Sequence, residues 1–255
     1  MAVRTTDLVA EWVAKLATGS GPGTNDPQVT TWVDNVGSFD GTLTGFGYTQ
    51  SSGWAGAGTT GDPYCLVFSG DNDYVDCGDI GDGFSDYNFS IECWLSAGTP
   101  ASNTGHPWSY KNTANDSTRL DLLIDPSAVE RFYMYNDAGT SDYNTLELPT
   151  TGWHHVVCLM PIGDANGHVY VDGSLQASYV AMSGAMTLDK FLMGALWFIG
   201  PAVAQFYEGK LATVRAYSSA MSADEIAANY AAGVTAASTD SAGFAGMTVT
   251  RLLQG

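Results

Sequence analysis

The sequence is poor in positive charge. Its 255 residues include 9 Lys and Arg against 27 Asp and Glu, which gives a formal net charge of −18. A surface of this sign repels polyanions, so we expect binding neither to nucleic acid nor to an anionic membrane. Charged residues of both signs make up only 14% of the chain, whereas typical soluble domains contain about 25%. An uncharged polar surface is therefore expected, as suits an extracellular or particle-bound protein.

Long apolar segments are also missing. No stretch approaches the roughly 18 apolar residues of a membrane-spanning helix. The opening segment "MAVRTTDLVAEWVAKLATGSG" lacks the continuous apolar core of an export signal. The four cysteines, Cys65, Cys77, Cys93 and Cys158, form no CxxC pair, so no zinc site is expected. We predict buried thiols, with a cross-strand Cys65–Cys77 disulfide as the alternative.

The patterns that are present are those of an all-β protein. Short alternating or apolar runs such as "NFSIECWLS" and "WHHVVCLM" recur between Gly, Asp, Asn and Pro, which predicts an antiparallel β-sandwich. The segment "GHVYVDGSLQASYV" predicts a hairpin with a type I′ turn at Asp172-Gly173, because both central residues need positive φ. One short helix is predicted in "MSADEIAANYAAG", capped by Ser222 and Glu225 and ended by Gly233.

The composition changes after residue 233. The stretch "VTAASTDSAG" is small and polar, and "GMTVTRLLQG" alternates as a strand does. We therefore predict one domain over residues 1–233, followed by a linker and a C-terminal β arm over residues 234–255. A lone strand must pair with a sheet edge, of its own sandwich or of a neighbour. We favour a neighbouring copy, hence a homo-oligomer, with Met247, Val249, Leu252 and Leu253 as the assembly residues.

Several motifs follow one another in a recognisable order. They are "LVAEW", "DNVGSFDGTLTG", "LVFSGDNDYV", "FSIECWL", "WHHVV", "VYVDG", "FIG" and "YEGKLATVRAYSSAMSADEIAANY". This order resembles the laminin-G-like, concanavalin A-like family of lectin and glucanase domains. The resemblance covers residues 7–233. It implies a jelly-roll sandwich of two stacked antiparallel sheets, closed by the short helix.

The acidic stretch "FSGDNDYVDCGD" at residues 68–79 has two interpretations. As a hairpin turn, it uses Gly70 for the bend and the Asp73 carboxylate to accept backbone hydrogen bonds. As a calcium loop, it would use Asp71 and Asp73 as ligands. The resemblance implies that some family members hold calcium with acidic residues on the strand that here reads "LATVRAY", where Ala and Thr stand instead. The hairpin is therefore favoured, no cofactor is expected, and structural Ca²⁺ is the alternative.

Catalytic patterns are absent. The resemblance implies that jelly-roll glucanases carry their carboxylates as E-x-D-x-E on one strand, and no such string occurs. Glu92 lies beside Trp94 on a predicted strand but has no acidic partner two or four residues away. His154 and His155 are adjacent on a strand, so they point to opposite faces and are expected to be structural. We therefore predict that the protein is not an enzyme.

Aromatic residues in Gly-, Ser- and Pro-rich segments are the candidate ligand-binding residues. They are Trp54 in "SSGWAGAG", Trp108 and Tyr110 in "HPWSYKN", and Trp197 in "GALWFIG", with Asn112 close by. Sugars stack their C–H faces on aromatic rings, and an amide can bind their hydroxyl groups. The alternative is that these rings fold back over the core, since large rings bury well.

These observations lead to a functional hypothesis. A domain of this kind works outside cells, yet the chain shows no export signal, as is expected of a virion component released by lysis. We therefore expect a non-catalytic virion surface protein: a head decoration, head-fibre or tail-attachment protein of a phage. Its expected partners are other virion proteins and host-surface glycans. The alternatives are a carbohydrate-binding module of a secreted, extracellular bacterial protein and a divergent glycan-acting enzyme.

Overall fold

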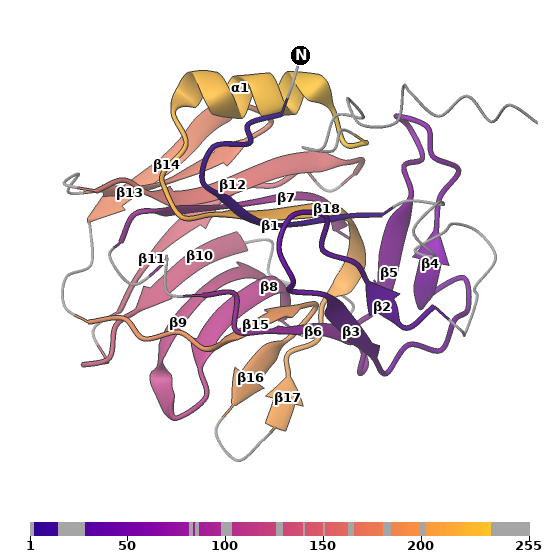
Figure 1. The fold of residues 1–255 in the computed structure, drawn as a ribbon, viewed down its shortest axis with the longest axis horizontal. Helices are drawn as coiled ribbons and strands as arrows, with labels where there is room; N and C mark the ends of the chain where they lie inside the picture. The colour runs from indigo at the N-terminus through magenta and orange to yellow at the C-terminus, as the bar shows by residue number, and fades with distance from the viewer. Residues whose placement is uncertain are drawn as a thin grey trace, which may run out of the picture.

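The computed structural model is an antiparallel β-sandwich. It describes residues 3–14, 29–81, 84, 87–97, 104–125, 130–139, 141–149, 151–162, 166–180, 185–198 and 202–235. Two eight-stranded sheets lie face to face, with one helix on the outside of one sheet and a small two-stranded sheet on the outside of the other (Figure 1). The predicted all-β jelly-roll class with one short C-terminal helix is confirmed.

Sheet A is the sheet that carries the helix. Its strand order is β14-β13-β12-β7-β18-β5-β4, with β1 paired to β18. The bounds are β1 Leu8–Val13, β4 Gly53–Ala55, β5 Cys65–Ser69, β7 Phe89–Ala97, β12 His154–Met160, β13 Asn166–Val171, β14 Ser174–Val180 and β18 Glu208–Tyr217. Helix α1, Ala223–Ala232, covers its outer face (Figure 1).

Sheet B is the opposite sheet. Its strand order is β11-β10-β9-β8-β15-β6-β3-β2. The bounds are β2 Thr31–Trp32, β3 Gly41–Thr44, β6 Tyr74–Gly78, β8 Gly105–Asn112, β9 Asn115–Ile124, β10 Glu130–Tyr135, β11 Ser141–Leu146 and β15 Lys190–Met193. The hairpin of β16, Leu196–Phe198, and β17, Ala202–Ala204, lies on its outer side (Figure 1).

The core lies between the two sheets and is rich in aromatic rings. Trp12 of β1 stacks on Phe191 of β15 with ring centroids 5.6 Å apart, and Phe191 also stacks on Trp108 of β8. The first contact joins sheet A to sheet B, the second lies within sheet B, and all three rings are fully buried. The four cysteines are free and buried, so the prediction of buried thiols is confirmed and the disulfide alternative is wrong.

The turn and the helix follow their sequence signals. Asp172 and Gly173 have φ of 50° and 77°, so the predicted turn with two positive φ values is confirmed. The Ser222 side chain accepts a hydrogen bond from the Glu225 amide, the Glu225 side chain binds back to the Ser222 amide, and Gly233 ends the helix. Within the described residues, no helix has the length and apolar character that a membrane span requires.

The described chain ends just beyond the helix. Val234 is buried against Ala212 and Trp94 on sheet A, and its carbonyl accepts a hydrogen bond from Thr213 Oγ1 at 3.0 Å. The predicted arm, with Met247, Val249, Leu252 and Leu253, lies outside the described residues. Its assembly role therefore stays a prediction.

Candidate functional site

Three of the predicted ligand-binding aromatics belong to the core. Trp54 is 1% exposed, and Trp108 and Tyr110 are 0% exposed. The segment "HPWSYKN" is strand β8 and not a loop, so Trp108 and Tyr110 alternate inward. A ring without exposed surface cannot stack on a sugar. The ligand-binding prediction is therefore wrong for these three residues, and the core-covering alternative holds.

The two other predicted ligand residues lie at the surface. Asn112 is half-buried at the end of β8, and its Oδ1 atom accepts a hydrogen bond from the Ala114 amide at 2.8 Å. Trp197 is half-buried on β16, with the Lys190 ammonium 5.4 Å from its ring centroid. Their part in ligand binding stays a prediction.

The acidic hairpin is held by its own side chains. Asp73 is buried, and its Oδ2 atom accepts a hydrogen bond from the Ser69 amide at 2.8 Å. Gly70 bends the chain with φ of 84°, and Asp71 is exposed. Among the described residues, no three His, Cys, Asp or Glu side chains come together as a metal site. The Asp73 contact therefore supports the hairpin interpretation. Calcium binding by Asp71 and Asp73 is not supported by any group of three ligand side chains in the described part of the chain.

Cross-strand pairing on the outer side of sheet B brings together residues far apart in the sequence. One row runs across β11, β10, β9, β8, β15 and β6 and contains Tyr143, Tyr133, Asp121, Ser109, Leu192 and Asp76. The next row runs across β10, β9, β8 and β15 and contains Tyr135, Arg119, Lys111 and Lys190. Strand pairing thus brings polar and aromatic residues from several strands to one side of the sheet, where Ser109, Lys111, Asp121 and Leu192 are buried.

The second row places three cations side by side. Arg119, Lys111 and Lys190 are direct cross-strand neighbours, an arrangement of like charges that destabilises a sheet. Together with Arg131, they account for four of the nine basic residues of the chain. In a protein of net charge −18, this concentration of basic residues marks the outer side of sheet B as a distinctive surface.

Aromatic rings lie against these cations. The Arg119 guanidinium carbon is 4.4 Å from the ring centroid of Tyr135 and 5.6 Å from that of Tyr133. The Arg131 guanidinium is 5.8 Å from the ring of Tyr143, and the rings of Tyr133 and Tyr143 are 5.1 Å apart. We call Arg119, Arg131, Tyr133, Tyr135 and Tyr143 the Tyr–Arg face. Tyr143 is 52% exposed, so this face presents an accessible aromatic surface.

Carboxylates fix the cations of the face. Arg119 Nε lies 2.8 Å from Asp121 Oδ1, whose other oxygen lies 3.1 Å from His106 Nδ1. Arg131 Nη1 donates to Asp125 Oδ2 at 3.3 Å. Asp121 is fully buried, so it can position Arg119 but cannot itself reach a ligand.

The β16–β17 hairpin borders the Tyr–Arg face. Lys111 is buried, with its ammonium 4.9 Å from the ring centroid of Phe198 in β16. Ser109 of β8 donates a hydrogen bond to the Ala195 carbonyl at 2.7 Å. Sheet B is therefore covered over β8 and β15, while the Tyr–Arg face on β9, β10 and β11 extends beyond that cover.

The outer side of sheet A has a charge cluster of a different kind. Arg215 donates to Glu92 Oε1 at 2.6 Å and to Glu11 Oε1 at 2.8 Å. Asn229 of α1 donates to Glu92 Oε2 at 2.7 Å, and His155 Nε2 lies 3.0 Å from Glu92 Oε1. All five residues are buried. We call them the buried charge network; it ties the helix to the sheet.

The pKa of Glu92 reflects these contacts. Burial by itself raises the pKa of this carboxyl, but the Arg215 guanidinium and the hydrogen bond with His155 outweigh it and lower the pKa to about 2. Glu92 therefore stays ionised and cannot act as a general acid. His154 likewise contacts a carboxylate, with Nδ1 2.8 Å from Asp172 Oδ2; that the two histidines are structural stays a prediction.

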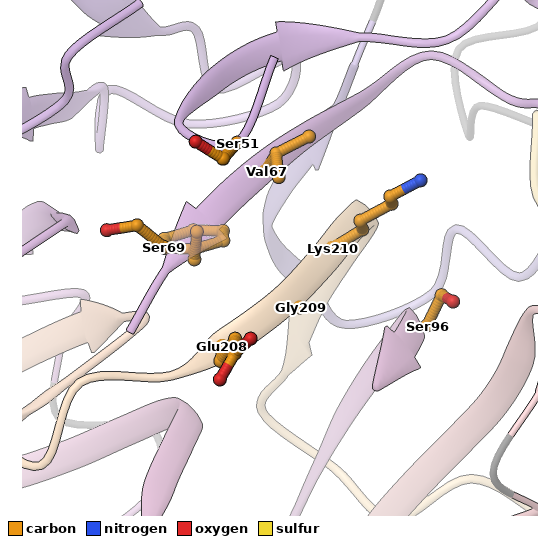
Figure 2. A pocket seen from close by; sticks show the side chains of 8 residues that line it. Ser51, Val67, Ser69, Ser96, Glu208, Gly209 and Lys210 are labelled. Atoms are coloured by element: carbon orange, nitrogen blue, oxygen red, sulfur yellow. The ribbon is translucent and has the colours of Figure 1, made fainter. Parts of the chain in front are cut away.

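A pocket of about 350 Å³ lies on the outer side of sheet A, beside β5, β18 and the end of β7 (Figure 2). Val67 and Lys210 are cross-strand neighbours, as are Lys210 and Ser96. Glu208 and Ser69 form the next pair. Among the described residues that line the pocket, Phe68 is the aromatic one, and its ring is buried. The pocket therefore offers hydroxyl and charged groups to a ligand, but no exposed ring on which a sugar could stack. The Tyr–Arg face is the better candidate site.

The Tyr–Arg face was not among the predicted sites, although the sequence contains a signal for part of it. In "RFYMY", Arg131, Tyr133 and Tyr135 recur at every second position, which places them on one side of a strand. Arg119 and Tyr143 join them only through strand pairing. Pairing between β9, β10 and β11 cannot be derived from local spacing.

The fold is a β-sandwich of the type found in concanavalin A-like lectins and glucanases. The family model of the concanavalin A-like lectin/glucanases superfamily matches residues 69–227, more than half of the chain. The chain therefore belongs to this family, as the sequence motifs indicated. No curated protein matches the chain.

Solved structures share the fold at low sequence identity. Domain 4 of AbnA, an extracellular arabinanase of family GH43 from Geobacillus stearothermophilus, in complex with arabinotriose, has a TM-score of 0.58 and 15% identity; the match covers 89% of this chain and 100% of that one. The CBM40 of the Ruminococcus gnavus IT-sialidase bound to α2,3-sialyllactose has a TM-score of 0.50 and 16% identity over 56% of this chain and 83% of that one.

A toxin domain is also similar. The binding domain of botulinum neurotoxin serotype D has a TM-score of 0.61 and 13% identity, and the match covers 88% of this chain. This chain spans about half of that domain, 51% of its length. At these identities, the three structures establish the fold alone.

Proposed function

We propose that this protein is a non-catalytic glycan-binding module that holds its ligand on the Tyr–Arg face. The observation that carries the proposal is the grouping of three tyrosine rings with the Arg131–Asp125 pair, in which Tyr143 is 52% exposed and Arg131 retains 28% of its side-chain exposure. Rings of this kind stack on the C–H faces of sugars. The adjacent guanidinium donates hydrogen bonds, and the carboxylate accepts them.

The similar structures support this proposal. The CBM40 is bound to α2,3-sialyllactose, and domain 4 of the arabinanase is in complex with arabinotriose. A sandwich of this kind therefore serves as a sugar-binding scaffold in two different proteins. One ligand is sialylated and the other is neutral, so the scaffold alone does not select the ligand.

The spacing of carboxylates argues against glycoside hydrolysis. Hydrolysis needs two carboxyl groups between about 5 and 9.5 Å apart. Asp121 and Asp76 are separated by three strand spacings, or about 14 Å, and Asp125 lies four residues along the strand from Asp121, or about 13 Å. Glu92 and Glu11 are buried on the other sheet. Neither the Asp121–Asp76 pair nor the Asp121–Asp125 pair meets the requirement, so we expect no release of reducing sugar.

We further propose that the module acts outside a cell, as a surface protein of a virus particle that binds host glycans, with an exported bacterial carbohydrate-binding module as the alternative setting. The low content of charged residues, 14%, supports an exposed extracellular position. Mass spectrometry of purified particles tests this setting. Detection of the chain only in bacterial culture supernatants free of particles would contradict the virion setting and support the alternative.

The decisive experiment uses a glycan array with the wild-type chain and a Tyr143→Ala variant. Leu175→Ala is the matched control, because Leu175 lies on sheet A and is 51% exposed, close to the 52% of Tyr143. Stacking of a nucleobase on an aromatic side chain contributes roughly 1–3 kcal/mol, and we take this value as the guide for a sugar ring. A free-energy difference of about 1.4 kcal/mol corresponds to a tenfold change in affinity. We expect the Tyr143 variant to bind at least about tenfold more weakly, while Leu175→Ala binds as the wild type does.

Both variants should unfold at the wild-type temperature, because neither side chain is buried. Two results would overturn the proposal. One is a wild-type chain that binds no member of a broad array. The other is a Tyr143→Ala variant with undiminished binding.

A further inference from the structure

We infer that the glycan held by the Tyr–Arg face is electrically neutral, because each accessible cation on the outer side of sheet B is already paired with a carboxylate. The inference rests on the proposed function and narrows its ligand class. It excludes sialylated, sulfated and uronic-acid-rich chains as preferred ligands. It includes chains built from uncharged sugars.

The ion pairs are the first support. Arg119 lies 2.8 Å from Asp121, and Arg131 donates to Asp125 at 3.3 Å. Lys190 donates to both oxygens of Asp76, at 3.0 and 3.1 Å. An acidic sugar would have to compete with a carboxylate that is already in place at each of these cations.

The fourth cation of this surface is inaccessible. Lys111 is 1% exposed and is covered by the Phe198 ring. It therefore cannot offer its charge to a ligand. The concentration of cations in this surface thus supplies rigidity and hydrogen-bond donors, and it does not create an exposed positive patch.

The charge around the face is the second support. Asp125 retains 16% of its side-chain exposure beside Arg131, which retains 28%. An anionic group that approaches Arg131 therefore meets the Asp125 carboxylate at the same time. The chain as a whole carries a net charge of −18, which repels anions before contact.

A neutral sugar meets no such opposition. Its ring can stack on Tyr143 or Tyr133, while one hydroxyl group accepts from the Arg131 guanidinium and a neighbouring hydroxyl donates to Asp125. Arg131 also lies within 3.4 Å of the Tyr133 hydroxyl. This places the polar pair directly beside the aromatic surface and suits the alternation of C–H faces and hydroxyl groups on a pyranose.

The test is an array of matched glycans, in which each neutral chain is present with and without a terminal sialic acid or sulfate. We expect the wild-type chain to bind neutral members at least tenfold more tightly than their acidic counterparts. Affinity for the neutral members should also be unchanged when the NaCl concentration is raised, because no charge is neutralised on binding.

An Asp125→Asn variant adds a readout that a purely structural role would not give. Removing this carboxylate leaves the Arg131 charge unpaired, so preference should shift toward the acidic chains. Asp62→Asn is the control, because Asp62 is exposed in the segment before β5, away from sheet B, and should keep the wild-type preference.

The outcomes separate the inference from the proposed function. Preference of the wild type for acidic chains would overturn the inference and leave glycan binding intact. An Asp125→Asn variant with an unchanged ratio of neutral to acidic binding would also overturn it, because neutrality would then have another source. Absence of binding to every glycan would overturn the proposed function itself.

Discussion

The two outer sides of the sandwich carry the same kinds of side chain but differ in what lies over them. On sheet A, Arg215 joins Glu92 and Glu11, and Trp94 stacks on Tyr230 of α1 at 5.8 Å. On sheet B, Arg131 pairs with Asp125, and the rings of Tyr133 and Tyr143 lie beside them. Helix α1 lies over the outer side of sheet A (Figure 1), whereas Tyr143 on sheet B is 52% exposed.

Under our proposal, cover by α1, and not residue type, separates the structural cluster on sheet A from the glycan-binding surface on sheet B. Under α1, each polar group of Glu92 is used by a protein partner, because a buried charge without partners is strongly destabilising. On the Tyr–Arg face, the same chemistry stays accessible, with Arg131 retaining 28% of its side-chain exposure and Tyr143 52% exposed. Substitutions of the buried residues beneath α1 should therefore change stability, and those on the Tyr–Arg face should change binding.

The largest effect is expected from Glu92→Gln. The variant leaves Arg215 with Glu11 as its remaining carboxylate in the network, and loss of one partner of a buried pair costs roughly 3–5 kcal/mol. Urea unfolding measures the change. Glu147→Gln is the control, because Glu147 is exposed beyond β11. Equal stabilities of the two variants would show that the network contributes nothing.

The second-largest effect is expected from acid, which should lower the free energy of unfolding through Glu92 in the buried charge network. The folded pKa of Glu92 lies near 2, below the ordinary value of 4.5. A lowered pKa stabilises the folded state above the ordinary value, and this stabilisation is lost as the pH falls from about 4.5 to 2. At about 1.4 kcal/mol per pKa unit, the loss is roughly 3 kcal/mol. Unfolding midpoints of wild type and Glu92→Gln over this range should converge, and parallel curves would contradict the assignment.

The β13–β14 turn tests the edge of the covered side. Gly173→Val should destabilise by roughly 1–3 kcal/mol, because a β-branched residue is strained at positive φ. A Cβ atom at this position would also meet Tyr230 Cδ1 at 3.1 Å. Gly61→Val is the control, since a Cβ there meets nothing within 4 Å. A thermal midpoint as high as that of the control would argue against the strained turn.

The smallest effect is expected from EDTA. A calcium ion at 100-fold over its dissociation constant would add about 2.7 kcal/mol. The Asp73 carboxylate already accepts a hydrogen bond from the Ser69 amide, so the hairpin does not need a metal ion to hold it. We therefore expect chelation to leave the thermal midpoint of unfolding unchanged within error. A fall of the size expected for calcium would reinstate Asp71 and Asp73 as ligands.

Local signals predicted the fold well. Alternation, the Asp172-Gly173 turn and the Ser222 capping box each depend on residues close together in the sequence, and each recurs in the structure. The site was harder to predict. Trp108 and Tyr110 stand among Ser, Pro and Asn, which suggested a loop, but strand pairing places this segment within sheet B.

The partners of Glu92 show the same limit. Arg215 lies 123 residues away along the chain and Asn229 lies 137 residues away. Spacing within one strand therefore found no partner for Glu92, although the folded protein provides several. The same limit applies to Tyr143 and Arg119. Tyr143 pairs with Tyr133 and Arg119 pairs with Tyr135, so β10 brings the two residues into one face.

The row of three neighbouring cations also bears on how the strands of sheet B find their alignment. Side chains alternate across a sheet, so a slip of one residue exchanges the two sides of a strand. For β8, such a slip would drive Lys111 into the aromatic core and expose Trp108 and Tyr110 to water. A misaligned β8 would therefore lose the contact between Lys111 and Phe198 and place a charge among apolar rings, so the buried lysine favours the native alignment over one shifted by a residue.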